Sequence, residues 1–343
     1  RPTTRRIHRR KKPGTMMYGQ GYPQGHPGVG GYAQPMPPYH DMAYPQHHSQ
    51  QAYVQHPQQQ PPNGVARAAV GSTAPASKSG LLSVVIKPDE MGEWYNCVYL
   101  IPHEPIRQWC LDMETYVVNN DSFDAVAYPW KMDNFFRFYN EYFYDVVHHH
   151  HDTEENLVNP WFSSKGINTP NKLEADHVVL MKYLDGVKDF ERQYRTMTSP
   201  TAPVVAGKAT AERVRELTLS LKRHLADMCK AMGPHLAEEE QYYPSQMRDK
   251  VSQAEWDAFE PRIIKKLGLK GAEQGLPHIV ACMQRWNPAM VGPFIEKLPG
   301  PIRYLFNTRW QPKYHNYCRP LLEGLTGDRP PPPYQGSGCC TIS

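Results

Sequence analysis

The stretch 150–155 reads HHDTEE, and the stretch 235–240 reads HLAEEE. Counted from His150 and His235, both follow the pattern H-x-x-x-E-E. Side chains four residues apart on an α-helix lie one turn apart on the same face. One metal ion can therefore take an imidazole nitrogen and a carboxylate oxygen from a single helix. The two stretches predict two such helices, each of which carries half of a metal site.

Each stretch lies within a stripe of apolar residues at helical spacing, and each of these two stripes is preceded by another one. The four helices are predicted from about Pro102, from Pro129, after Pro170, and from about Ala209 to Tyr243. Four long amphipathic segments joined by modest loops predict an all-α, up-down-up-down four-helix bundle. The stripes are His103, Ile106, Cys110, Met113 and Val117; Phe136, Tyr139, Phe143, Val147, His150, Glu154 and Leu157; Leu173, His177, Leu180, Met181, Leu184 and Val187; and Val214, Leu217, Leu221, Leu225, Met228, Met232, His235, Glu239 and Tyr242.

The first and third stripes each contain a single histidine on the apolar face, His103 and His177. The chain therefore holds two half-sites of the form His … His-x-x-x-Glu. Antiparallel packing of the helices would bring the two halves together around a two-metal centre in the core of the bundle.

On these residues the chain resembles the hemerythrin-like family, the HHE cation-binding domains, over about residues 95–250. The resemblance implies two iron ions bridged by Glu154 and Glu239. It implies His103, His150, His177 and His235 as terminal ligands, and an open position on one iron that binds dioxygen or a similar small molecule. Imidazole and carboxylate donors suit iron, and they also suit zinc or manganese.

Three details complicate this interpretation. His151 with Glu155 is an alternative register to His150 with Glu154, although the face of His150 is the more apolar one. Many family members place a second histidine four residues after the third-helix histidine, where this chain has Met181. That difference predicts one less saturated iron. Pro234, just before His235, predicts a kink or a restart of the fourth helix.

The chain divides by composition into four parts. Residues 1–80 are rich in Pro, Gln, Tyr and Gly and predict a disordered tail, because they offer little aliphatic surface to bury. Residues 81–250 hold the predicted bundle, and residues 251–325 a helical extension whose first helix is expected from a capping box at Ser252–Glu255 to about Lys266. Residues 326–343 form a Pro-rich linker and tail.

Charge and cysteine usage exclude several classes of protein. Subtracting the seven basic residues of positions 1–12 from the net charge of +4 leaves −3 for the rest, so no nucleic-acid partner is expected. Five cysteines are scattered singly through the globular part, which favours a reducing compartment. No stretch reaches 18 consecutive apolar residues, so no transmembrane helix is expected.

The last four residues, Cys340 to Ser343, fit the C-a-a-X pattern and predict a farnesyl group on Cys340, with Cys339 as a palmitoylation site. These lipids would hold a cytoplasmic protein at the cytosolic face of a membrane. Pro331–Tyr334 reads PPPY, a form that WW domains bind.

The patterns favour a non-enzymatic di-iron protein that binds or senses dioxygen, nitric oxide or iron, anchored to a membrane by a lipid. A di-iron oxidase or peroxidase is the first alternative. A lipid-anchored adaptor with a purely structural bundle is the second. No catalytic triad, phosphate-binding loop or dinucleotide-binding glycine pattern occurs in the sequence.

Overall fold

The computed structural model describes residues 83–199 and 207–334, which form one compact unit. Within these two ranges every regular element is helical and no strand occurs. The predicted all-α class is therefore confirmed. The predictions for the tail of residues 1–80 and for Cys339 and Cys340 lie outside the described residues.

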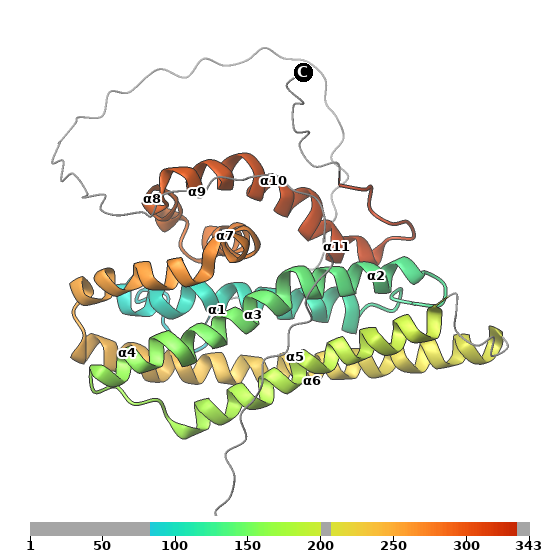
Figure 1. Ribbon diagram of the computed structural model, residues 1–343, viewed down its shortest axis with the longest axis horizontal. Helices are drawn as coiled ribbons and strands as arrows, with labels where there is room; N and C mark the ends of the chain where they lie inside the picture. The colour runs from blue at the N-terminus through green and yellow to red at the C-terminus, as the bar shows by residue number, and fades with distance from the viewer. Residues whose placement is uncertain (1–82, 200–206, 335–343) are drawn as a thin grey trace, which may run out of the picture. The chain divides into compact units, whose positions relative to one another are not determined.

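Four long helical segments lie alongside one another (Figure 1). The first is α1 (Trp94–Met113), which continues into a π-helical turn, Glu114–Val118. The third is α5 (Asn171–Thr198) and the fourth is α6 (Gly207–Lys250), which packs against both α1 and α5. The second segment consists of α2 (Pro129–Phe138), a π turn (Tyr139–Tyr144), α3 (Asp145–Thr153), a π turn (Glu154–Val158) and α4 (Asn159–Ser164).

Two helix boundaries differ from the sequence prediction. α1 begins at Trp94 instead of Pro102, and Pro102 lies inside it. α6 does not restart at Pro234 but continues through that residue to Lys250. A proline inside a helix removes a backbone hydrogen bond. Packing compensates for the lost hydrogen bonds, since tertiary contacts supply most of the stability of a helix. Leu100, near Pro102, and Leu236, near Pro234, are fully buried.

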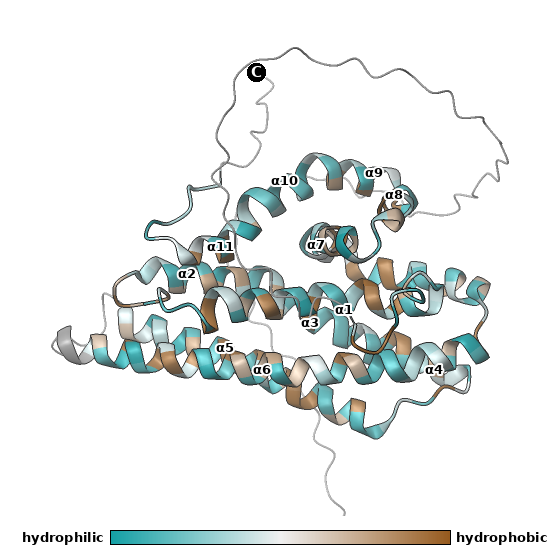
Figure 2. Cartoon of the chain, turned by 180° about the vertical axis from the view of Figure 1, so that it is seen from behind, coloured by the Kyte–Doolittle hydropathy of each residue, from teal (hydrophilic) through white to brown (hydrophobic). Residues whose placement is uncertain are grey.

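The predicted apolar stripes form the core of the bundle. Apart from His150, Leu157, Met181 and Tyr242, which are partly exposed, their members are buried. Polar and apolar residues alternate along the same helices in Figure 2, as expected for amphipathic segments. Burying one large apolar side chain contributes about 1.5–3 kcal/mol. The core therefore holds the four helices at fixed positions around the polar residues within it.

The C-terminal extension covers one side of the bundle. α7 (Gln253–Trp286) packs on α1 and α3, and its N-terminus carries the predicted capping box between Ser252 and Glu255. Gly268 bends α7 because its φ of 64° lies in the left-handed region. The break at Gly268 lies two residues after Lys266, so the predicted end of this helix agrees with the structure, and a second helical piece follows the break to Trp286. It is followed by α8 (Pro288–Lys297), α9 (Gly300–Leu305), a π turn (Phe306–Trp310), α10 (Gln311–Lys313), a π turn (Tyr314–Cys318), α11 (Arg319–Glu323) and a 3₁₀ turn (Gly324–Thr326).

Neither an apolar membrane span nor a disulfide occurs in the described ranges. Their helices all lack the length and apolar character needed to cross a membrane. The five cysteines of these ranges are buried and free: Cys97, Cys110, Cys229, Cys282 and Cys318.

Candidate metal centre

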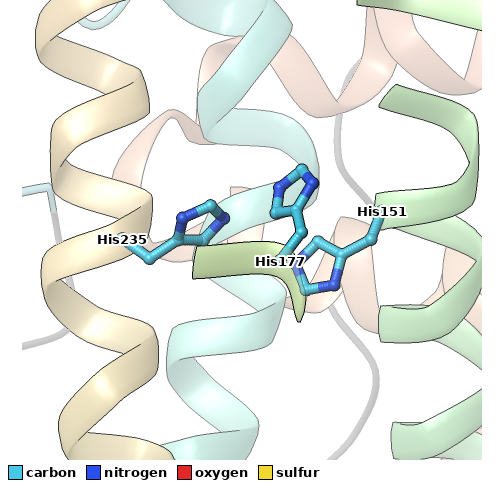
Figure 3. A group of neighbouring side chains, drawn as sticks. All are labelled: His151, His177 and His235. Atoms are coloured by element: carbon cyan, nitrogen blue, oxygen red, sulfur yellow. The ribbon is translucent and has the colours of Figure 1, made fainter. Parts of the chain in front are cut away.

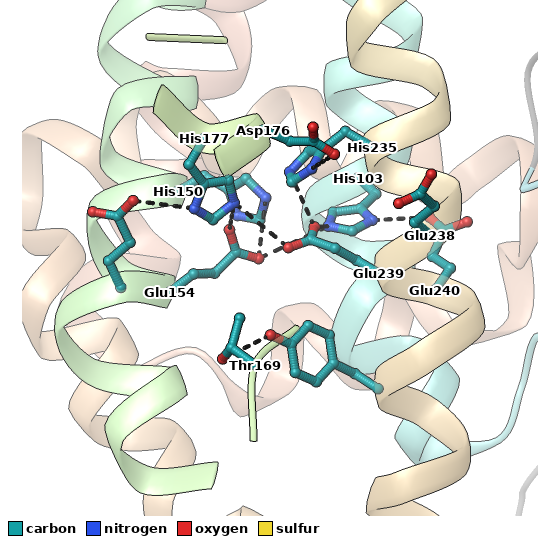
Figure 4. Close-up of polar contacts among 12 residues, drawn as sticks. His103, His150, Glu154, Thr169, Asp176, His177, His235, Glu238, Glu239 and Glu240 are labelled. Atoms are coloured by element: carbon teal, nitrogen blue, oxygen red, sulfur yellow. Dashed lines mark hydrogen bonds and ion pairs between the residues drawn. The ribbon is translucent and has the colours of Figure 1, made fainter. Parts of the chain in front are cut away.

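Seven histidine and glutamate side chains from all four helical segments converge in the core of the bundle; Figure 4 labels six of them and Figure 3 labels the seventh, His151. They form two groups, and within each group the candidate ligand atoms all lie within 4.8 Å of one another. The four-ligand group is His103, His150, Glu154 and Glu239, and the three-imidazole group is His151, His177 and His235. All six residues predicted as ligands are therefore brought together, and His151 joins them.

The two carboxylates of the four-ligand group also contact the other group. Glu154 lies 3.4 Å from Nε2 of His150 and, through its second oxygen, 3.7 Å from Nε2 of His177. Glu239 lies 3.3 Å from Nε2 of His103, 3.5 Å from Nε2 of His235 and 3.6 Å from Nε2 of His177. Each carboxylate thus stands between imidazoles of both groups, where it can bridge two ions.

The three-imidazole group is held by ring contacts between three helices (Figure 3). The ring of His151 on α3 stacks on that of His177 on α5, with centroids 4.5 Å apart, and lies edge-on to that of His235 on α6 at 5.6 Å. His177 and His235 are themselves 4.8 Å apart. The side chains of His177 and His235 are at most 2% exposed.

His150 and His151 both point into the centre, so the choice between the two registers does not arise. Adjacent residues on an α-helix point about 100° apart, which would place one of them away from a narrow site. This centre is wide enough for α3 to present His150 toward His103 and His151 toward His177. Glu155, the partner of His151 in the alternative register, belongs to neither ligand group.

Met181 does not leave the group around His177 short of an imidazole. Met181 packs against the apolar core, and His151 from the neighbouring helix completes a group of three imidazoles. The run of four histidines at 148–151 was the signal for this replacement, because it offers two adjacent ligands where one was expected.

The second glutamate of each H-x-x-x-E-E stretch contacts the single histidine of another helix. Oε1 of Glu240 lies 2.9 Å from Nδ1 of His103, and Oε1 of Glu155 lies 3.2 Å from Nδ1 of His177. A carboxylate on the outer nitrogen of an imidazole fixes the orientation of the ring and leaves the inner nitrogen for a metal. Sequence reasoning missed this role, although the doubled glutamates of both stretches were its signal.

Glu240 is itself held by a buried polar network. Arg107 donates a hydrogen bond of 2.6 Å to its Oε1, and the hydroxyl of Ser83 donates one of 2.5 Å to its Oε2. Arg107 also pairs with Glu104 on α1. The side chain of Glu240 is fully buried, so its charge needs compensation. Arg107 and the hydrogen-bond donors provide it.

Burial and the neighbouring carboxylates shift the pKa values of the residues of the centre in different directions. It lowers the pKa of His151 well below its usual value and that of His235 to about 4. Burial opposes protonation of His177 too, but the carboxylates of Glu239 and Glu154 raise its pKa to about 9. Burial and the nearby Glu239 raise the pKa of Glu154 to about 7. Neutral imidazoles are ready ligands, and a metal cation can replace the proton on His177.

The residues present fit a metal ion. Each of the seven side chains has a buried atom without a hydrogen-bond partner among the residues that the structure describes, and an unpaired buried polar atom costs about 1–3 kcal/mol. Imidazole and carboxylate donors together suit iron, zinc or manganese. The buried atoms without a hydrogen-bond partner are Nε2 of His103, His150 and His177, both ring nitrogens of His151 and His235, and Oε2 of Glu154 and Glu239.

The predicted WW-binding stretch, Pro331–Tyr334, lies at the end of the described part of the chain. Pro332 and Pro333 are exposed, whereas Tyr334 is partly buried with its ring 5.7 Å from that of Tyr317. Binding of a WW domain stays a prediction.

Comparison with known proteins agrees with this geometry. No curated protein and no solved structure matches the chain. One family model does match, over a segment that contains six of the seven converging residues and ends just before Glu239. Residues 103–236 match the model described as the Hemerythrin HHE cation binding domain, so this part of the chain is similar to that domain.

Proposed function

We propose that the centre binds two iron ions and, on one of them, a diatomic molecule such as dioxygen or nitric oxide. The observation that carries the proposal is the convergence of seven side chains, six of them buried and His150 partly buried, whose inner atoms lack hydrogen-bond partners among the described residues and whose two carboxylates contact both groups. A bundle with a purely structural role would be destabilised by so many unpaired polar groups in its core. That cost argues against the adaptor alternative.

The two groups offer different numbers of protein ligands. One ion would be held by His103 and His150, and the other by His151, His177 and His235, with Glu154 and Glu239 shared between them. The first ion then has four protein donors and the second has five. The first ion therefore has more room for an external ligand. When bound, a pair of iron ions supplies electrons that can be exchanged with such a ligand.

The proposal is tested by loading the purified protein with ferrous iron without oxygen and then admitting oxygen. We expect about two irons per chain and a new absorption band that disappears when oxygen is removed. Continued consumption of oxygen in the presence of an added reductant, which returns the oxidised iron to the ferrous state in each cycle, would favour the oxidase alternative instead. A chain that retains no iron after desalting would refute the proposal.

A further inference from the structure

An apolar chamber of about 430 Å³ lies beside the four-ligand group. Its walls come from α1, α3, α7 and α8, so the C-terminal extension closes a space that the four bundle helices alone would leave open. His150 and Glu154 form part of its wall. The chamber thus reaches the four-ligand group, whose ion would have the fewer protein donors.

The lining of the chamber is divided by chemistry. Most of it is apolar: Trp94, Val98, Ile101, Ile106, Ile263 and Phe294 are among its residues. α3 contributes the apolar Val146 and two polar residues, His149 and Thr153, which are next to the two ligands in sequence. Nε2 of His149 and Oγ1 of Thr153 are buried and have no hydrogen-bond partner in the described ranges. Three further charged residues line the chamber: Asp257 and Lys297, which are exposed, and Glu260, which is partly buried.

The size of the chamber does not fit a diatomic ligand alone. Protein interiors are close-packed, and a volume of this size falls within the range of about 300–1,000 Å³ that is typical of small-molecule sites. A Cβ at Gly275 of α7 would lie 4.0 Å from Val146 of α3, an ordinary contact distance, so α7 passes close to α3 at this point of the wall.

We propose that the chamber binds a molecule with a hydrocarbon chain and one oxygen-bearing polar group, such as a fatty acid. The chain would pack against the apolar walls. The polar group would take the free atoms of His149 and Thr153, and so lie beside His150 and Glu154. This inference rests on the proposed function, because it identifies the chemical class of molecule held next to the metal centre.

Binding is measured with a dansyl-labelled fatty acid and the metal-loaded full chain. Trp94 and Trp109 line the chamber, so a bound probe quenches tryptophan emission by energy transfer. We expect saturable binding of one probe per chain, displaced by unlabelled fatty acid and not by an apolar peptide. Displacement by the peptide alone would identify a docking groove for protein and overturn the proposal.

The variant Ile263→Trp fills the chamber and should weaken probe binding by about tenfold or more, given that a single misplaced methylene in an apolar pocket changes binding by about tenfold or more. Leu219→Trp is the control, because Leu219 is 57% exposed and is not part of the lining. If Ile263→Trp fails to fold, Ile263→Ala takes its place and should shift the preference toward longer chains. Equal binding by the wild type and both Ile263 variants would overturn the proposal.

Metal analysis of the same samples separates the two proposals. Probe binding without bound metal would refute the metal centre and leave the chamber as a lipid site. Bound metal without probe binding would refute the chamber alone. With cobalt in place of iron, the fatty acid should shift the visible absorption of the metal, and an unchanged spectrum would show that the polar group lies away from the centre.

Discussion

The two ligand groups of the centre are built differently. The four-ligand group takes its imidazoles from α1 and α3, and the apolar chamber lies against it. The three-imidazole group takes one histidine each from α3, α5 and α6. Glu154 and Glu239 contact members of both groups. Under the proposed function, the three-imidazole group would give its ion five protein donors, whereas the four-ligand group would give its ion four and lies beside the chamber.

The largest effect is expected from a change that removes a shared residue. Glu239→Ala should lower bound metal from about two equivalents toward none, because Glu239 contacts His103 of one group and His177 and His235 of the other. Metal analysis after dialysis measures the loss. Glu238→Ala is the matched control, since Glu238 pairs at the surface with Lys172. Retention of one full equivalent would assign Glu239 to a single group.

A change confined to the three-imidazole group should have about half that effect. His151→Ala should release the ion of this group and leave that of the four-ligand group in place, so about one equivalent remains. His148→Ala, at an exposed position in the same run of histidines, should retain both ions. Loss of both ions from His151→Ala would show that the groups do not bind independently.

Glu240 and Glu155, the carboxylates on the outer nitrogens of His103 and His177, should differ in their effect on metal affinity. Glu240→Gln should weaken metal binding by about 10- to 100-fold, because a charged partner of a ligand histidine orients it. Glu155→Gln should have a smaller effect, since the side chain of Glu155 is 50% exposed and its charge is screened by water. Chelator competition measures both, with Glu174→Gln at an exposed position of α5 as the control. Equal effects would remove the distinction between the two partners.

The smallest expected effect is the dependence of metal affinity on pH. The raised pKa of His177 keeps its imidazole protonated in the metal-free protein near neutral pH. The metal must displace that proton, so affinity should rise with pH, by about tenfold per pH unit for each proton released, until the pKa of His177 is passed. Calorimetry in buffers of different ionisation enthalpy counts the protons. Binding without proton release would contradict the assigned protonation.

The all-α class and most of the site could be predicted from the sequence, because helical periodicity and the spacing of His and Glu are local properties. The role of His151 could not be predicted, because it depends on the width of the centre between α3 and α5. The continuity of α6 through Pro234 depends on burial of its neighbours, and the partners of Glu240 lie far away in the sequence at Ser83 and Arg107. The chamber depends on packing of α7, which no local pattern encodes.

X-ray absorption spectroscopy of the iron-loaded protein tests the central claim most directly. Two irons held in adjacent groups should each show a metal neighbour at about 3.5–4 Å, together with scattering from imidazole rings. Iron that shows imidazole scattering but no metal neighbour, at one equivalent per chain, would contradict the dinuclear centre.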